Sequence, residues 1–414
     1  MSFKKREAIE AISDLVRRDS SKKIKKFKIY TILPKGNIGD RHHSEGIVQA
    51  VLYKLINDYQ FDYKDIQCIS YEASCCRELA NKKKLVTELC RWQQENVTDK
   101  GGITLILAVG PNDYFAEILG QVIDKPNALS VYSTHQLSSR ITSLVKLPHI
   151  IAVPRCSISE QQIEALKDKT TLILVNDIAH PLDNRALYEG RKSYLAAGYR
   201  PIGKIDKNTI GIILGGDAPD IDGTILRFTP EQAQFLAKNI LQFEREQRPC
   251  GEKLRFIVIN GPRTGKYNID GQPYNPSPHN SGKLDRVTEA FIQTLINHHM
   301  DVDCYNFQFS QQPSAYIPLL ASFKETNNRG NLHVPGDSLS MISETTTHLS
   351  NVIIDELPSM NECHYRFCQD FFRTGKASFL KWRGEINYSH PDTVKQPAAS
   401  QVVAEAILLK IFGS

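Results

Sequence analysis

The feature that most constrains the fold is a repeated alternation of short apolar runs with helix-length segments. In the first half, the strand-like apolar runs occupy residues 27–33, 66–70, 103–109, 128–133, 149–154 and 171–176. Helical stretches near 44–58 and 78–97 separate the earlier runs. Because strands separated by helix-length segments form parallel sheets, this half is predicted to be an α/β domain with helices flanking a parallel sheet.

The same alternation occurs again in the second half. Its strand-like segments lie at 209–217, 254–262 and 301–307, and its helical segments at 229–246 and 283–299. Thr229 stands before Pro230, the arrangement of an N-cap followed by proline in the first helical turn. The second half is therefore also predicted to be an α/β domain with a parallel sheet.

The length of 414 residues exceeds what one hydrophobic core usually organises, so two domains are expected. Segment 183–207 is rich in glycine and proline and has little periodicity, so we place the boundary there. The predicted divisions are a first α/β domain at 1–200, a second α/β domain at 201–395 and a C-terminal helix within 396–414 that can pack back on the first domain.

Composition narrows the classes of function. The formal charge of +5 arises from 51 basic and 46 acidic residues, too small an excess to indicate nucleic-acid binding. Nine scattered cysteines form no disulfide framework, which favours a reducing, cytoplasmic location. The sequence contains no run of about 18 apolar residues, so no membrane-spanning helix is predicted. The basic helix expected at 5–17 leaves two interpretations open, a solvated face or peripheral contact with an anionic membrane.

A glycine-containing turn follows the first predicted strand. Gly36, Asn37, Gly39 and Asp40 lie in it, and glycine there lets a backbone approach a ligand near a helix N-terminus. The spacing matches neither the dinucleotide fingerprint nor the Walker loop. A ligand contact and a tight strand-to-helix connection are therefore both consistent with the turn.

Two strand ends of the second half carry small and basic residues. Gly215, Gly216 and Asp217 follow one strand, and Arg263, Thr264 and Lys266 follow the next. Glycine N–H groups could hold phosphate or sugar, and the two cations could bind a diphosphate. A permissive turn and solvated surface charge are the alternatives.

The most informative motif is the serine-rich segment at 335–345. It is predicted to open a helix with Asp337, Ser338, Ser340 and Met341 near its start and with Glu344 within two turns. Helix-start N–H groups hold phosphate oxygens, and a carboxylate there can accept two ribose hydroxyls. The alternative is structural, with Asp337 or Ser338 capping the helix and Glu344 offsetting its dipole.

Other catalytic centres are less well supported. The neighbours His42 and His43 would point in different directions on a helix, and Cys363, His364 and Cys368 have no second pair at zinc-site spacing. We therefore expect no metal. Gly-x-Ser-x-Gly does not occur, so no α/β-hydrolase nucleophile is indicated.

In order, the motifs resemble those of the mitochondrial-fission proteins named after the plant "elongate mitochondria" factor, with their bacterial relatives. The matching segments are KGNIGDRHHSEGIVQAVLYKL, NTIGIILGGD, FIVINGPRTGK and GDSLSMISET. The family's Ser-Arg-Arg-Thr-Pro becomes Gly-Pro-Arg-Thr-Gly here, which removes one basic residue. Asp40 and Arg41 stand where many relatives have His-Glu or Glu-Asn, and the family's helix Gln has no counterpart, which suggests an altered acceptor.

The resemblance implies a GT-B-like fold, in which two Rossmann-like domains face a cleft. It also implies metal-independent glycosyl transfer from a nucleoside diphosphate sugar, with no other cofactor, to an unknown acceptor. The donor would lie on the second half and the acceptor near the first turn, with Asp40 or His42, and then Asp113, as the base. Two alternatives stay open, a non-catalytic recruitment protein on a vestigial scaffold and a nucleotide-sugar epimerase.

Overall fold

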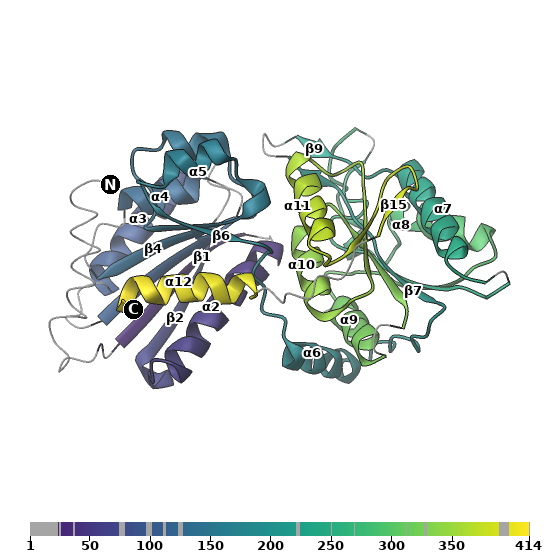
Figure 1. Ribbon diagram of the computed structural model, residues 1–414, viewed down its shortest axis with the longest axis horizontal. Coiled ribbons are helices and arrows are strands. Elements are labelled where there is room, and N and C mark those ends of the chain that lie inside the picture. Colours follow the sequence, from purple (N-terminus) through teal and green to yellow (C-terminus); the bar gives the residue numbers. More distant parts are fainter. Residues whose placement is uncertain are drawn as a thin grey trace. The chain divides into compact units, whose positions relative to one another are not determined.

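A computed structural model describes residues 24, 26–35, 38–73, 79–96, 102–110, 113–122, 127–220, 224–249, 251–268, 270–311, 313–326, 329–388 and 397–413. The chain divides into two compact units (Figure 1). Unit 1 comprises Met1–Pro181 with Gln396–Ser414, and unit 2 comprises Leu182–Lys395. Within the described residues, every helix is too short or too polar to cross a bilayer.

Unit 1 contains a sheet of six parallel strands in the order β2-β1-β3-β4-β5-β6. The strands are β1 (Lys26–Pro34), β2 (Ile66–Ala73), β3 (Gly102–Val109), β4 (Ala128–Ser133), β5 (Ile150–Pro154) and β6 (Thr171–Val175). The residues of β4 and β5 are buried throughout, as expected for strands covered on both faces.

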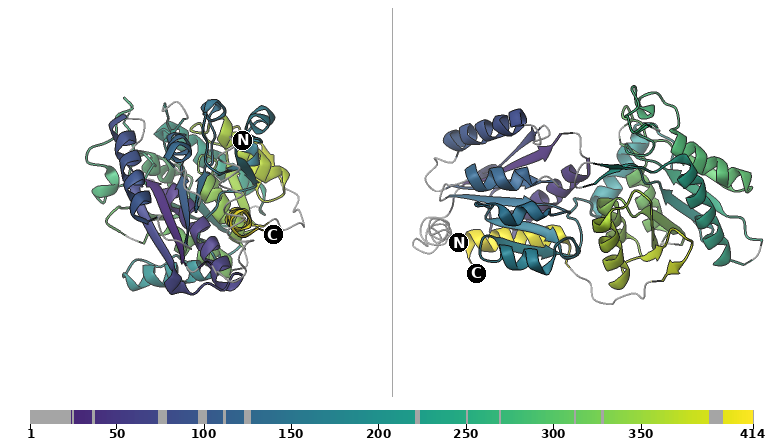
Figure 2. Two further views of the ribbon diagram at one scale, coloured as in Figure 1. Left: turned by 90° about the vertical axis from the view of Figure 1, so that its left-hand side faces the viewer. Right: turned by 90° about the horizontal axis from the view of Figure 1, so that it is seen from above.

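Helices cover both faces of this sheet. The helices are α2 (Ile38–Asn57), α3 (Leu79–Asn96), α4 (Tyr114–Val122), α5 (Glu160–Leu166) and α12 (Ala399–Phe412), with short 3-10 turns at Tyr63–Asp65, Ser139–Ser143 and Arg155–Ser157. One core cluster contains α2 and α12, and the opposite cluster contains α3, α4 and α5. In the left view of Figure 2, the yellow α12 is seen end-on beside the strands.

Apolar residues at helical spacing hold α12 in unit 1. Val403, Ala404, Ile407 and Ile411 are buried in the same cluster as the α2 side chains. The first N–H of the helix, on Ala399, donates to Asp177 Oδ1 at 2.8 Å. The segment that follows unit 2 in sequence therefore completes the core of unit 1.

Unit 2 contains seven strands in the order β11-β10-β7-β12-β13-β14-β15. The strands are β7 (Thr209–Ile213), β10 (Arg255–Ile259), β11 (Asp301–Tyr305), β12 (Asn331–Pro335), β13 (Val352–Asp355), β14 (Ser378–Leu380) and β15 (Ile386–Asn387), and β8 (Ala218–Pro219) pairs separately with β9 (Ile225–Leu226). All neighbours in the large sheet are parallel except β14 and β15. An antiparallel edge strand thus extends the expected parallel sheet.

The unit 2 helices are α6 (Asn184–Ala196), α7 (Pro230–Glu246), α8 (Arg286–Asn297), α9 (Tyr316–Glu325), α10 (Leu339–His348) and α11 (Glu362–Arg373), with a 3-10 turn at Pro278–Asn280. Side chains of α7 and α8 pack with Ile210 and Ile212 of β7 in one core cluster. Between them, Gly211 faces Phe323 of α9 so closely that a Cβ would lie 2.7 Å from that ring. Helix α9 therefore lies on the face of the sheet opposite to α7 and α8.

The predicted fold class, two Rossmann-like α/β domains with helix-flanked parallel sheets, is confirmed. Thr229 caps α7 through a capping box, as the sequence indicates. The segment at 183–207, however, contains α6, which is capped by Asp183 and packs on α9, so the structure divides the chain at Pro181 rather than at 200. The basic helix expected at 5–17 lies outside the described residues, and the cleft expected between the domains stays a prediction.

A buried network of charges connects the sheet of unit 2 to α7. His333 of β12 lies 2.9 Å from Glu244 and 2.8 Å from Asp355. Arg248 and Asn331 also bond Glu244. Burial alone would lower the pKa of His333, but the two facing carboxylates raise it to about 9. Burial raises the pKa of Asp355, whereas the pKa of Glu244 is lowered by His333 and Arg248 against the effect of its burial.

This network predicts that unit 2 loses stability at alkaline pH. The stabilisation from charged His333 is complete below its unfolded pKa of 6.5 and disappears as pH rises through about 9. Denaturant unfolding at pH 6.5 and above pH 9 should show a fall on the order of 2 kcal/mol in the wild type. His333→Gln should flatten this dependence, whereas the exposed control His298→Gln should retain it. An unchanged pH slope in His333→Gln would contradict the assignment.

Candidate functional site

The candidate site in unit 2 lies where the sheet changes direction. The chain runs from β7 to β10 and β11 on one side and then crosses to β12 and β13 on the other. Loops leaving the carboxyl ends of β7 and β12 therefore diverge, and ligands of open α/β sheets bind at such a point. The motifs that begin at Gly215 and Gly336 form these two loops.

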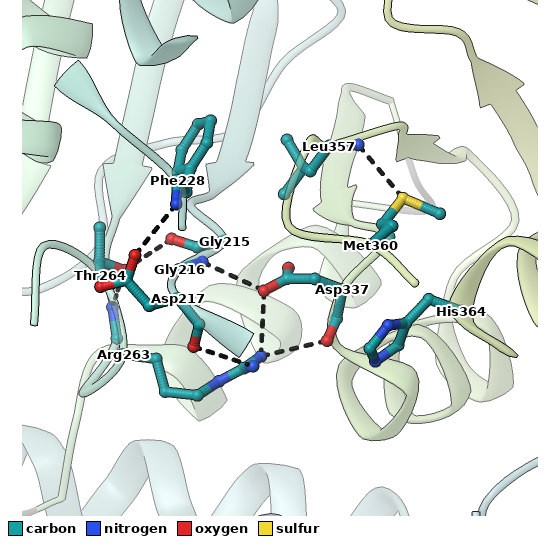
Figure 3. A network of polar contacts seen from close by, with 12 residues as sticks. Gly215, Gly216, Asp217, Phe228, Arg263, Thr264, Asp337, Leu357, Met360 and His364 are labelled. Carbon is teal, nitrogen blue, oxygen red and sulfur yellow. Dashed lines mark hydrogen bonds and ion pairs between the residues drawn. The ribbon is translucent and has the colours of Figure 1, made fainter. Parts of the chain in front are cut away.

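Asp337 connects the two loops and holds a cation between them (Figure 3). Its Oδ2 accepts the N–H of Gly216 at 3.2 Å and lies 3.3 Å from the Arg263 guanidinium. Arg263 also donates to the carbonyls of Asp337, at 3.2 Å, and of Asp217, at 3.5 Å. Burial raises the pKa of Asp337, although Arg263 and the Gly216 N–H act against this. Arg263 is thus held at the switch point by three oxygens.

Both glycines after β7 are required by close packing against protein atoms. A Cβ on Gly215 would lie 2.3 Å from Leu357 and 2.7 Å from the carboxylate of Asp337. A Cβ on Gly216 would lie 2.4 Å from the backbone of Arg263. Their missing side chains are therefore explained by loop packing, and any contact of these glycines with a ligand stays a prediction.

Asp217 and Thr264 organise the loops around Arg263. Asp217 accepts the N–H groups of Phe228 at 3.0 Å and of Tyr267 at 3.2 Å. Thr264 donates to the Gly215 carbonyl at 2.9 Å and accepts the Gly261 N–H. Both side chains are buried, so these contacts position the site, and their predicted contact with substrate stays untested.

The start of α10 offers partly exposed groups that suit an anion. Ser338 is the N-cap residue, yet its side chain makes no capping hydrogen bond to the helix. Ser338, Ser340 and Met341 are all partly exposed at this end. A helix N-terminus with uncommitted hydroxyl and N–H groups can bind phosphate. Lys266, the second predicted cation, is exposed and lies over the ring of Tyr267.

Glu344 connects α10 to a neighbouring cavity. It is buried, and its Oε2 accepts the hydroxyl of Tyr316 at 2.6 Å. Burial, together with the charge of Glu344, raises the pKa of Tyr316 well above its usual value, so the phenol stays a donor. Tyr316 begins α9 and also lines the cavity.

The cavity has a volume of about 320 Å³ and lies at the carboxyl ends of β10 and β11. Its aromatic and amide lining residues are Tyr194, Tyr199, Asn260, Tyr305, Asn306, Phe307, Gln308, Gln311 and Tyr316. Arg200 also lines it and stacks 4.2 Å from the centre of the Tyr305 ring. Flat faces together with amides suit a planar or polyhydroxyl ring. Sequence reasoning missed this cavity, although the aromatic and amide run NFQFSQQ directly follows β11.

Unit 1 has a second switch point, between β1 and β3. Helix α2 begins at Ile38, earlier than the predicted helix at 44–58, so Gly39, Asp40 and His42 lie within the helix rather than in a turn. Gly36 and Asn37 lie outside the described residues. Of the residues predicted to face an acceptor, those that the structure describes therefore lie at the start of α2, next to this switch point.

Asp40 is buried at this switch point. Its Oδ2 lies 3.2 Å from the position of a Cβ on Gly110, the residue after β3, and its Oδ1 lies 3.9 Å from His135 Nδ1. Burial raises the pKa of Asp40 from 3.8 to about 7. A carboxyl group with this pKa can exchange a proton near neutral pH, which a general base requires.

The other candidate bases of unit 1 differ in their surroundings. His42 is partly exposed, whereas its neighbour His43 is buried and bonds Ser133 Oγ at 2.8 Å. Burial, with His135 and His180 nearby, lowers the pKa of His43 to about 3, so it is neutral. Burial also raises the pKa of Asp113, although its hydrogen bond from Ser138 opposes the shift.

No cluster of three or more His, Cys, Asp or Glu side chains in the described part of the chain could hold a metal ion. Cys363, His364 and Cys368 lie on α11, where His364 takes part in the helix capping box with Asn361. Cys368 is buried and forms no disulfide.

Comparison with known proteins gives only distant likenesses. No protein-family model and no curated protein matches the chain, so the resemblance to the fission proteins is not supported. A UDP-glucosyltransferase from Polygonum tinctorium is 9% identical with a TM-score of 0.47, over 94% of this chain and 99% of that chain. The N-terminal domain of Candida albicans trehalose-6-phosphate phosphatase is 9% identical, with a TM-score of 0.43, over 94% and 97%.

A third solved structure, S. aureus MnaA with UDP, is 11% identical with a TM-score of 0.43, over 93% of this chain and 95% of that chain. Likenesses this low assign no activity to the chain. Any function must therefore be argued from the two switch points and the cavity of unit 2.

The raised pKa of Asp40 predicts that this residue destabilises unit 1 at neutral and alkaline pH. Ionisation in the folded state is disfavoured, so stability falls as pH rises from 3.8 through about 7. Asp40→Asn should therefore raise the free energy of unfolding on the order of 2 kcal/mol at pH 8 and leave it nearly unchanged near pH 4. The exposed control Asp168→Asn should not do so. Equal effects of the two variants at pH 8 would contradict the prediction.

Proposed function

We propose that the chain is a nucleotide-sugar-dependent glycosyltransferase that transfers sugar to an acceptor hydroxyl without a metal. The observation that carries this proposal is the order of groups in unit 2. Arg263 and the start of α10 suit a diphosphate, Glu344 lies on the same helix, and Tyr316 connects Glu344 to an aromatic cavity. Phosphate, ribose and base occur in this order in a nucleoside diphosphate.

The diphosphate is the leaving group of the proposed reaction and gains negative charge as the sugar departs. Arg263 can stabilise this charge through its guanidinium, and the N–H groups of Ser340 and Met341 can do so at the positive end of α10. Lys266, which is exposed on the loop after β10, supplies a further positive charge. In this proposal these protein groups provide the electrostatic stabilisation.

The position of Glu344 indicates where the ribose and the base of the donor would bind. One of its oxygens accepts the Tyr316 hydroxyl, and a carboxylate can accept further hydrogen bonds from vicinal hydroxyls. Beyond Tyr316, the cavity offers aromatic faces to a nucleobase. Glu344 therefore orients the donor in this proposal, and it takes no part in proton transfer.

Asp40 of unit 1 is the proposed general base. In its ionised form it removes the proton from the acceptor hydroxyl as the oxygen attacks the anomeric carbon, while the bond from that carbon to the diphosphate breaks. A pKa of about 7 leaves a large fraction of Asp40 ionised at neutral pH and still basic. Asp40 is preferred to His42 because it is buried at the switch point beside Gly110 and His135, whereas His42 is partly exposed.

A second candidate function, a non-catalytic interaction protein on the same scaffold, has one observation in its favour. The Gly216 N–H and the Arg263 guanidinium already bond Asp337. Groups that satisfy one another in this way maintain the fold without a ligand. The binding experiment below separates the two functions, because an interaction protein of this kind binds no nucleotide.

The first prediction of the proposal concerns nucleotide binding. Millimolar UDP, GDP, CDP or TDP should raise the melting temperature of unit 2, since a ligand at 100 times its Kd stabilises by about 2.7 kcal/mol. For the nucleotide that the wild type binds most tightly, Arg263→Met and Glu344→Gln should each lower the affinity at least about tenfold. Each substitution removes a charged hydrogen-bonding partner. The exposed control Arg286→Met should bind as the wild type does. Absence of any shift would favour the interaction protein.

The second prediction concerns Asp40. Asp40→Asn should lower donor turnover by roughly 100-fold or more and leave nucleoside diphosphate affinity unchanged, because it removes the base and not the donor site. The wild-type rate should rise with pH through about 7, where Asp40 ionises. Donor consumption by purified protein with hydroxyl acceptors measures both effects. The exposed control Asp168→Asn should keep wild-type turnover. If Asp40→Asn also kept it, Asp40 would be excluded as the general base.

A further inference from the structure

The cavity of unit 2 is lined by a buried amide whose donor group is unsatisfied. Gln308 is only 4% exposed, and its Oε1 accepts the N–H of Gly282 at 2.9 Å. Its Nε2 has no hydrogen-bond partner among the described residues. A buried donor without an acceptor is unfavourable, so such a group on a cavity wall indicates a missing ligand atom.

The orientation of this amide is fixed by its other contact. A backbone N–H can only donate, so the atom of Gln308 that faces Gly282 must be the oxygen. Rotating the amide by half a turn would bring two donors together and lose the 2.9 Å hydrogen bond. Gln308 therefore presents its Nε2 donor, and not its oxygen, to a ligand, whether or not a ligand is bound.

The neighbouring amides of the cavity, buried Asn260 and half-buried Asn306, are already engaged. Asn260 accepts the Phe307 N–H at 2.6 Å and donates to Asp285 at 2.8 Å. Asn306 accepts from Asn260 at 2.9 Å and donates to the Lys283 carbonyl at 3.2 Å. These hydrogen bonds hold the loop after β11 in place, whereas the Nε2 donor of Gln308 remains available to a ligand.

We infer that Gln308 makes the cavity selective for a ring that presents a carbonyl oxygen rather than an amino group. This inference rests on the proposed function, which places the nucleobase of the donor in the cavity. A keto oxygen accepts the Nε2 hydrogen, whereas an amino group at the same edge would bring donor against donor. Stacking on the aromatic walls is similar for every base, so the difference between bases depends on this hydrogen bond.

Matched nucleotide pairs test the inference. UDP and CDP differ at the keto or amino edge of a pyrimidine, and inosine diphosphate and ADP differ in the same way in a purine. Calorimetry first shows whether the pyrimidine pair or the purine pair binds better. Within that pair, wild-type protein should bind the keto member about tenfold more tightly than the amino member. Gln308→Leu should remove this preference by weakening the keto member. Gln308→Glu keeps an acceptor for Gly282 and should favour the amino member instead.

Gln311→Leu is the matched control, because Gln311 lines the same cavity but is exposed. It should leave the keto preference intact. Binding of nucleotides without a keto preference, or with a preference that Gln308→Glu leaves unchanged, would overturn the inference and leave the proposed function standing. If wild-type protein bound none of the four nucleotides, both would be overturned. Melting curves of each variant verify that the fold is retained.

Discussion

The buried carboxylate of Asp337 is the contact on which the candidate site of unit 2 depends. Parallel strands send their following loops apart at the switch point, and nothing in the sheet itself brings those loops together again. Asp337 does so by accepting the Gly216 N–H and by holding Arg263. The same contact requires glycine at position 215, because a side chain there would displace the carboxylate.

Much of the fold could be predicted because its strands are buried on both faces and appear as plain apolar runs. The predicted strand at 128–133 and the final helix at 399–412 agree with β4 and α12. Helix α6 was missed because its glycine and charged residues obscure the apolar spacing, although Asp183 is an ordinary capping residue. The early start of α2 was missed because glycine at position 39 suggested a turn.

The candidate site was less predictable because its chemistry depends on contacts distant in sequence. The pKa of Asp40 is raised by burial beside Gly110 and His135, which no local pattern around Asp40 indicates. Arg263 could be named from its strand end, but its partner Asp337 is 74 residues away. The free donor of Gln308 depends likewise on the contact with Gly282, 26 residues earlier.

The position of α12 has a consequence for the order in which the chain can fold. Unit 2 is inserted between the two segments of unit 1, and Val403, Ala404 and Ile407 belong to the unit 1 core. During synthesis, all of unit 2 leaves the ribosome before these side chains do. Until they emerge, α2 covers that face of the unit 1 sheet without α12, and the apolar surface that α12 will bury stays exposed to solvent or to a chaperone.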